Sequence, residues 1–245
     1  MDTALTSISL YGLVIAFVPV AIVIGIMIRW SAGAPTAIYA SLRMLIQLLL
    51  IGYVLVYIFE TDQPVIIIAV LVIMLTMASW IAIRPLQKKQ PQTYLNSLAA
   101  ISVGGILTLA LVSQVVVGVE PWFSPRYVVP LAGMIFAGSM NAVSLAGERL
   151  QSEFDKGTSY VEARRVSLQA SLIPITNSLF AVGLVALPGM MTGQILSGVS
   201  PLVAAKYQIV VMTMLFGTSG ISAALYLVLA NRSLRRSNFP KHQGD

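Results

Sequence analysis

Several polar side chains that could recognise a substrate interrupt long apolar stretches of the sequence. Arg43 and Gln47 lie four residues apart, which places them on one face of a helix. Asn141 and Ser144 form a similar pair in a later stretch, and all four are predicted to line the cytoplasmic entrance of a substrate pathway. Two simpler explanations stay open: the Arg43 side chain would extend to the lipid headgroups, and the other three would hydrogen-bond between helices.

A second set of candidate groups follows a helix-breaking Pro-Gly pair near residue 188. Met190, Met191 and Gln194 are predicted to line or gate the outer half of the same pathway, because thioether sulfur suits soft metal ions. Core filling is the alternative for the two methionines. Sequence alone leaves the presence of a metal site unknown.

Small residues recur at four-residue spacing in this segment, at Gly189, Gly193 and Ser197. Such spacing lets two membrane helices approach closely. The three residues are therefore predicted to form a packing seam, either within the chain or between two copies of it.

The composition places these groups in a membrane. Residues of the set AVILMFWYC make up 57% of the 245 positions, charged residues make up only 10%, and the mean hydropathy is +0.86. A soluble domain carries about 25% charged residues, so these charges are too few to coat a soluble globule. The chain is predicted to be an all-α, polytopic integral membrane protein.

Charge-free runs indicate about seven membrane spans. A bilayer core about 30 Å thick needs about 20 mostly apolar helical residues. The predicted spans are residues 8–28, 37–59, 64–83, 95–117, 127–147, 174–198 and 205–230. The sixth contains Pro174 and Pro188, so it is predicted to be one broken span, with a short helix plus a re-entrant segment as the alternative.

Basic residues sort to one side of this arrangement. With the N-terminus outside, 13 of the 15 Lys and Arg residues fall on the cytoplasmic side, and only Arg126 and Lys206 fall on the other. Because cytoplasmic loops are rich in Lys and Arg, the N-terminus is predicted outside and the C-terminus in the cytoplasm. Residues 1–236 are predicted to form a single transmembrane domain, and residues 237–245 a polar cytoplasmic tail. The net charge of +6 then reflects topology, and no nucleic-acid partner is predicted.

One connection, residues 148–173, is long and charged. The fifth helix is predicted to continue to about residue 155 and to stop at Gly157, because glycine readily adopts the left-handed conformation. Ser159 and Glu162 have capping-box spacing, which predicts a new helix from about residue 160. That helix is predicted to end or bend near Pro174.

This hairpin is either a plain connection between spans or a docking element for a cytoplasmic partner, with side chains exposed at Phe154, Tyr160 and Val161. No lysine follows a glycine, so the Gly-Lys pair of a phosphate-binding loop is missing, and any ATP hydrolysis must come from another chain. No Asp or Glu lies within a predicted span, which disfavours a proton-driven carrier. Without cysteine, few groups remain for a membrane-embedded enzyme.

Motifs along nearly the whole chain resemble the FetB-type iron-export permeases, a family related to plant aluminium-tolerance membrane proteins. The motifs are Arg43–Leu48, Gly133–Asn141 continuing to Leu150, Leu172–Pro174 with Asn177-Ser178, and Leu187–Ile195 followed by Pro201 and Tyr207-Gln208. The resemblance implies a permease of an ATP-binding-cassette exporter in the bacterial inner membrane, in which two permeases pair with two separate ATPase chains. It implies that the hairpin couples to the ATPase through Glu148, Arg149, Gly157, Glu162 and Ala163.

The leading hypothesis is therefore a permease, not an enzyme, that exports iron or another metal species. ATP acts through the partner subunit, and no cofactor is expected on this chain. A channel or facilitator that needs no ATPase is one alternative. Another is an ATP-binding-cassette permease for an anionic metabolite, because Arg43 in the inner half favours an anion or a complexed metal over a bare cation.

Overall fold

The computed structural model describes residues 9–61, 63–87 and 90–238, and α-helices dominate this part of the chain. The prediction of an all-α fold is confirmed. The chain divides into two compact units, Met1–Thr61 and Asp62–Asp245. The single transmembrane domain stays a prediction, and most of the predicted polar tail, from residue 239 onward, lies outside the described residues.

Six helical segments of the described residues are long and apolar enough to cross a membrane. They are Leu10–Arg29, Ala34–Glu60, Pro64–Ala82, Pro91–Val116, Pro125–Asp155 and Pro201–Asn231. Each overlaps one of the predicted spans other than 174–198. The polytopic membrane architecture is therefore confirmed, whereas the number of crossings and their orientation stay predictions.

The first unit is a helical hairpin. Helix α1 (Leu10–Ala16) and helix α2 (Val18–Arg29) meet at Phe17, so the first predicted span is interrupted at that residue. Pro19 sits in the first turn of α2, where a missing backbone N–H costs nothing. A short turn through Gly33, at φ +76°, leads into helix α3 (Ala34–Glu60), which packs against α2.

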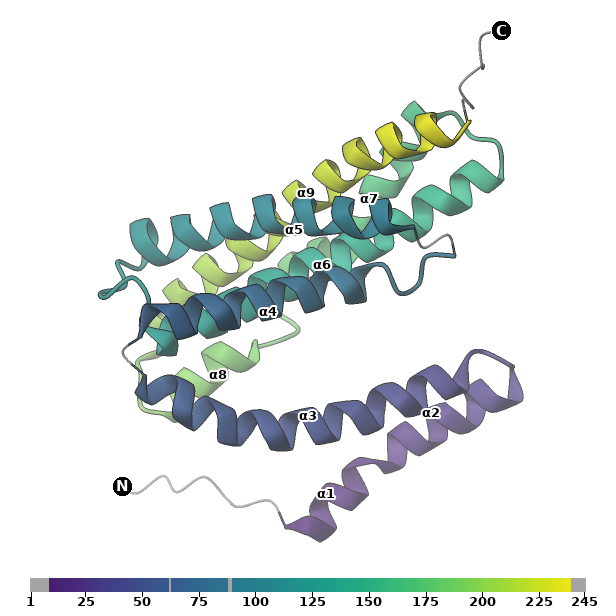
Figure 1. Ribbon diagram of the computed structural model, residues 1–245. Coiled ribbons are helices and arrows are strands. Elements are labelled where there is room, and N and C mark those ends of the chain that lie inside the picture. Colours follow the sequence, from purple (N-terminus) through teal and green to yellow (C-terminus); the bar gives the residue numbers. More distant parts are fainter. Residues whose placement is uncertain (1–8, 62, 88–89, 239–245) are drawn as a thin grey trace, which may run out of the picture. The chain divides into compact units, whose positions relative to one another are not determined.

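The second unit contains the remaining helices (Figure 1). They are α4 (Pro64–Ala82), α5 (Pro91–Ala110) with its π-helical extension η1 (Leu111–Val116), α6 (Pro125–Asp155), α7 (Tyr160–Ala181), α8 (Gly189–Leu196) and α9 (Pro201–Asn238). Helices α4, α5, α6 and α9 each begin with proline. Proline has a helical φ and lacks only an N–H that the first turn cannot use, so these residues set the helix starts.

Helices α6 and α9 run side by side in the same direction. The Ser139 and Thr218 hydroxyls hydrogen-bond at 2.8 Å, and a Cβ on Gly147 would lie 3.1 Å from the Tyr226 ring. Contact partners therefore advance together along both helices. Because α6 and α9 are parallel, the segment that joins them must run back along the length of the bundle. Helices α7 and α8 together form this returning segment.

The segment predicted as the sixth span is thus a helix, an irregular turn at 182–188 and a second helix. Helix α7 was predicted to end or bend near Pro174, and the first alternative is wrong, because α7 continues through that residue to Ala181. A proline removes one helical hydrogen bond, and the packing of α7 against both α6 and α9 keeps the helix intact around it.

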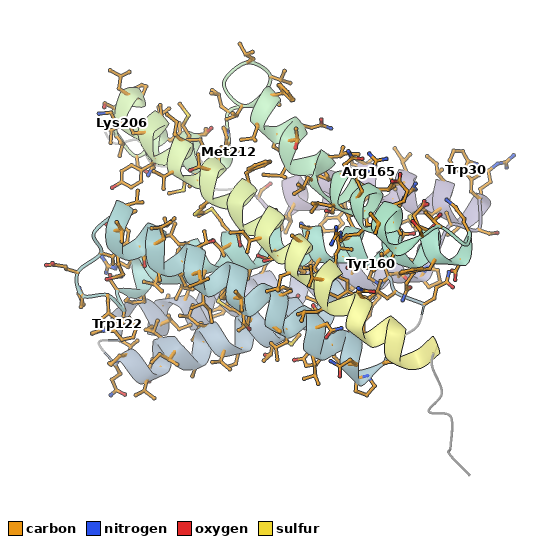
Figure 2. All side chains as sticks on the ribbon, turned by 90° about the horizontal axis from the view of Figure 1, so that it is seen from above. Trp30, Trp122, Tyr160, Arg165, Lys206 and Met212 are labelled. Carbon is orange, nitrogen blue, oxygen red and sulfur yellow. The ribbon has the colours of Figure 1, made fainter. Side chains whose placement is uncertain are left out.

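The two ends of the second unit carry different residues. Figure 2 shows Trp122 and Lys206 at one end of this bundle, with Tyr160 and Arg165 at the other. The predicted topology assigns the first pair to the outer side and the second to the cytoplasm. The arrangement along the bundle therefore agrees with the sorting of the charges.

Candidate substrate pocket and coupling hairpin

A pocket of about 310 Å³ lies between α6, α7 and α9. This volume falls in the range of small-molecule sites, about 300–1,000 Å³. Its polar lining combines one amide and three hydroxyls: Asn141 of α6, Ser171 and Ser178 of α7, and Ser219 of α9. Met134 adds a thioether, and all lining side chains are uncharged.

The lining groups differ in what they still offer to a ligand. The Ser171 hydroxyl donates to the Leu168 carbonyl at 2.8 Å, and the Ser178 hydroxyl donates to the Pro174 carbonyl at 3.0 Å, so these two oxygens remain acceptors. Within the described residues, the side chains of Asn141 and Ser219 make no hydrogen bond and can both donate and accept.

Pro174 lies in the pocket wall and alters the backbone beside it. Because proline has no N–H, the carbonyl of Ala170, four residues earlier, loses its usual helical donor. Inside a membrane such a carbonyl is tolerated where protein or a polar cavity surrounds it. The polar groups of the pocket therefore lie beside a position where α7 lacks one backbone hydrogen bond.

The predicted entrance residues are found on two different units. Asn141 lines the pocket, whereas Ser144, three residues further along α6, does not contribute to its wall. Arg43 and Gln47 lie on α3 in the first unit. With the Gln47 amide oxygen turned toward Arg43, that oxygen accepts from the arginine Nε at 3.1 Å and Nη2 at 3.2 Å. The structure thus pairs Arg43 with Gln47, as their spacing predicts.

The predicted outer group lies on the short helix α8. Met190 and Met191 are partly exposed, and the Gln194 side-chain oxygen is buried without a hydrogen-bond partner among the described residues. Gln208 of α9 is 5% exposed, and its side-chain oxygen is also buried without a hydrogen-bond partner among the described residues. Gln208 was not predicted as a site residue. Its sequence signals were its place in the Tyr207-Gln208 motif and a polar side chain in an apolar run.

Gly189 and Gly193, the first two residues of the predicted packing seam, lie on α8. A Cβ added at either glycine would meet no heavy atom within 4 Å. The Ser197 hydroxyl donates to the Gly193 carbonyl at 2.8 Å. The predicted packing seam, within the chain or between two copies, therefore stays a prediction.

The predicted coupling hairpin forms as expected. Helix α6 ends at Asp155, Gly157 adopts φ +79°, and α7 begins at Tyr160. The Ser159 hydroxyl accepts from the Glu162 backbone N–H at 3.5 Å, so the predicted cap is confirmed. These features depend on local sequence, which explains why they could be predicted.

A buried carboxylate organises the turn of this hairpin. Glu153 is 8% exposed and accepts a hydrogen bond from the Thr158 hydroxyl at 3.0 Å. Arg149 and Lys156 form ion pairs with the Glu153 carboxylate at 2.8 and 3.3 Å. Arg149, predicted to couple to the ATPase, therefore also holds the turn together. Glu148, beside it, is exposed.

The exposed face of the hairpin is smaller than predicted. The Tyr160 hydroxyl donates to the Leu227 carbonyl of α9 at 2.9 Å, and its ring stacks on Phe154. Both aromatic side chains are thus engaged within the chain, whereas Val161 is 68% exposed. Ala163 is fully buried, so it packs the hairpin from inside.

Glu162 presents a charged group at the surface of α7. Arg165 donates from Nε and Nη2 to its two carboxylate oxygens at 3.0 and 2.6 Å. These hydrogen bonds hold the pKa of Glu162 below its ordinary value, and the same pairing raises the pKa of Arg165. The side chains stay 47% and 60% exposed, so the pair is accessible to a partner.

No cluster of three or more His, Asp or Glu residues that could hold a metal ion is found in the described part of the chain. The pocket instead offers alcohol, amide and thioether groups. Such groups bind a ligand through hydrogen bonds and shape, or bind a metal only weakly.

Comparisons with known proteins agree with this membrane architecture. The model of the uncharacterised protein family UPF0014 matches residues 10–234. A UPF0014 membrane protein of Synechocystis is 35% identical, with 84% of each chain covered. The Escherichia coli protein named probable iron export permease FetB is 34% identical over 88% of this chain and 83% of its own.

A plant relative completes the comparison. The Arabidopsis thaliana protein ALUMINUM SENSITIVE 3 is 33% identical over 76% of this chain and 72% of its own. No solved structure matches the chain. The family match covers all the helices described above except the last turn of α9, and the chain belongs to the UPF0014 family of membrane proteins.

Proposed function

We propose that this chain is the permease subunit of an ATP-binding-cassette exporter that moves iron or another metal species out of the cytoplasm. The ATPase would be a separate chain, two permeases would pair, and the complex would lie in the bacterial plasma membrane. A relative named probable iron export permease supports the substrate class.

The observation that carries this proposal is the course of α7. Its first turn holds Glu162, a half-exposed charge of the hairpin, and its far half contributes Ser171, Pro174 and Ser178 to the pocket. Glu162 and Ser178 are separated by about 24 Å along the helix axis, at about 1.5 Å per residue. One continuous helix thus joins a surface suited to an ATPase with a pocket suited to a substrate.

The packing of α7 favours its movement as one body. Ala163, Ser167 and Ser171 are 0–3% exposed and recur every four residues. Small residues at this spacing bring helix backbones close together. A displacement of the hairpin would therefore travel along α7 to the pocket wall, where Pro174 removes one backbone hydrogen bond and eases bending.

The uncharged pocket favours a metal that carries its own ligands. A bare divalent ion prefers carboxylate, imidazole or thiolate ligands, whereas Asn141 and the serine hydroxyls suit the polar edge of a complex. In the first unit, Arg43 keeps a positive charge beside Gln47, which fits an anionic complex. The same charge supports the second candidate, a permease for an anionic metabolite.

Copurification tests the coupling part of the proposal. The tagged chain, extracted from native membranes in mild detergent, is expected to retain an ATP-binding-cassette ATPase, identified by mass spectrometry. Glu162→Ala should reduce the amount retained several-fold while the permease yield stays unchanged. Glu120→Ala is the matched control, because Glu120 is an exposed carboxylate at the opposite end of the bundle. If both variants retain the same amount of ATPase, Glu162 is not part of the coupling surface.

A further inference from the structure

Two polar atoms lie buried between the pocket and the hairpin without a hydrogen-bond partner among the described residues. They are Nε of Arg149 on α6 and the hydroxyl oxygen of Ser167 on α7. Ser167 is fully buried, whereas the rest of the Arg149 side chain is partly exposed. Because an unpaired buried polar group is costly, two of them in one place call for an explanation.

Arg149 and Ser167 extend the walls of the pocket by one helical turn. Leu145 of α6 and Ser171 of α7 are the pocket residues nearest the hairpin on their helices. Arg149 and Ser167 lie four residues beyond them, and hence on the same helix faces. Since α6 and α7 are antiparallel and joined by residues 156–159, Arg149 lies level with about residue 166. Both unpaired groups therefore lie at one level, next to the pocket.

Positive charge exceeds negative charge around Arg149. Its Nη2 donates to the Glu153 carboxylate at 2.8 Å, and Lys156 reaches the same carboxylate at 3.3 Å, so two bases share one acid. Glu148 is the next acid along α6, but it is exposed and points about 100° away from Arg149 around the helix. The guanidinium of Arg149 thus keeps donors for a further acceptor.

Arg164 adds a second arginine on the same face of α7. It lies three residues before Ser167, and its guanidinium carbon is 5.6 Å from the centroid of the Tyr160 ring. Among the described residues, no carboxylate forms an ion pair with it. Glu162 and Arg165 pair with each other and so add no net charge. The approach to the pocket from the hairpin is therefore positively charged.

We propose that Arg149, Arg164 and Ser167, here called the entrance cluster, bind an oxyanion group of the cargo, a carboxylate or a phosphate. Guanidinium groups suit such groups because their planar donors match two acceptor oxygens, and the Ser167 hydroxyl can donate as well. The pocket beyond is uncharged, so the cluster holds the anionic group while the rest of the cargo enters. The inference rests on the proposed function and assigns recognition of the charge of its cargo to named residues.

Equilibrium binding to the purified full-length chain, in mild detergent and without an ATPase, tests this site. The probes are radiolabelled citrate, the same citrate as its ferric complex, and radiolabelled inorganic phosphate. Ser167→Ala is the most informative variant, because it removes an unpaired hydroxyl and keeps a small residue in the stripe of α7. Its melting temperature should not fall, whereas oxyanion binding should weaken by about 2–10-fold, the effect of one hydrogen bond.

Two arginine variants separate charge from geometry. Arg149→Lys keeps a positive charge beside Glu153 but lacks the Nε donor, and it should bind the probes several-fold more weakly. Arg164→Gln should also weaken binding several-fold. Arg84→Gln is the matched control, because Arg84 is an exposed arginine just after α4, near the end of α6, where the Gln87 N–H donates to Gln151. This control should bind like the unchanged protein.

The three probes distinguish the sources of the oxyanion. Tightest binding of citrate or of ferric citrate would support a carboxylate, with or without its metal, and tightest binding of phosphate would support a phosphate. Three results would overturn the proposal: no binding of any probe, unchanged binding by Ser167→Ala and Arg149→Lys, or an equal loss in Arg84→Gln. Because the assay needs neither ATPase nor transport, the entrance cluster and ATP-driven metal export can fail separately.

Discussion

Gly104 of α5 leaves less room for a side chain than any other glycine described in the second unit, and replacing it with alanine gives the sharpest test of the packing. A Cβ at this position would overlap the Ser222 hydroxyl oxygen and lie 3.2 Å from the Ser222 backbone nitrogen. Ser222 is fully buried and donates to the Ser139 hydroxyl at 3.1 Å, which in turn hydrogen-bonds to Thr218. The new methyl group must therefore displace a buried, hydrogen-bonded side chain.

The magnitude of this effect can be worked out from two contributions. Overpacking a close-packed site costs about 1–3 kcal/mol. Losing the hydrogen bond between Ser222 and Ser139 costs about 0.5–1.5 kcal/mol. Alanine favours a helix over glycine by only about 0.5–1 kcal/mol, so Gly104→Ala should lower the free energy of unfolding by about 0.5–4 kcal/mol.

The assay is unfolding of the purified protein in mixed micelles with increasing SDS, followed by tryptophan fluorescence and circular dichroism. Gly193→Ala is the control, because its Cβ meets open space and the helix gains propensity. Ser222→Ala combined with Gly104→Ala should recover part of the lost stability, since it removes the nearest atom. Two results would refute this packing. One is a Gly104→Ala variant that is as stable as Gly193→Ala. The other is a double variant whose loss of unfolding free energy is no smaller than the sum of the losses in the two single variants.

Three further predictions concern the pocket and the hairpin. Asn141→Ala should lower transport of the metal species several-fold without changing ATPase retention, whereas Ser144→Ala, just outside the pocket, should change neither. Tyr160→Phe removes the hydrogen bond to the Leu227 carbonyl, so it should cost about 0.5–1.5 kcal/mol and increase proteolysis of the hairpin, measured by limited digestion of membranes. Because Arg165 lowers the pKa of Glu162, the carboxylate stays charged even somewhat below its ordinary pKa. The favourable contribution of the pair is complete above the ordinary pKa and is lost only as pH falls through the lowered value. ATPase retention should therefore be unchanged between about pH 7 and about pH 5, and a loss within that range would contradict the ion pair.

Local patterns predicted much of the fold. Apolar run length located six helices, because crossing hydrocarbon imposes a minimum length on each. Gly157 and Ser159 located the turn of the hairpin, because a left-handed glycine and a capping hydroxyl act over a few residues. The Arg43 and Gln47 pair follows from helical periodicity alone.

Long-range packing could not be predicted in the same way. Pro174 was expected to end or bend α7, but neighbouring helices on two sides keep the helix continuous to Ala181. Ser171, Ser178 and Ser219 were not recognised as pocket residues, because isolated serines in apolar helices are common and only the packing of α6, α7 and α9 brings them together. Ser178 sits four residues after Pro174, which is the one local signal that pointed toward them.

Some residues of the candidate site were placed correctly from the sequence and others were not, and the difference has a physical reason. Asn141 was identified because an amide in hydrocarbon is costly and usually faces a cavity or the bundle interior, and it lines the pocket. Ala163 was assigned to a docking surface, yet it is fully buried, because the face that a helix turns toward its neighbour depends on tertiary packing. Tyr160 was misread in the same way, since its hydroxyl reaches the backbone of α9, 67 residues away along the chain.

Reconstitution tests the central claim most directly. The permease and its copurified ATPase would be placed in liposomes with iron on the side of the hairpin, and iron movement would be followed with and without ATP. The account predicts ATP-dependent iron transport that requires both chains and is reduced several-fold by Glu162→Ala. Iron movement by the permease alone, unchanged by ATP or by the ATPase, would contradict it.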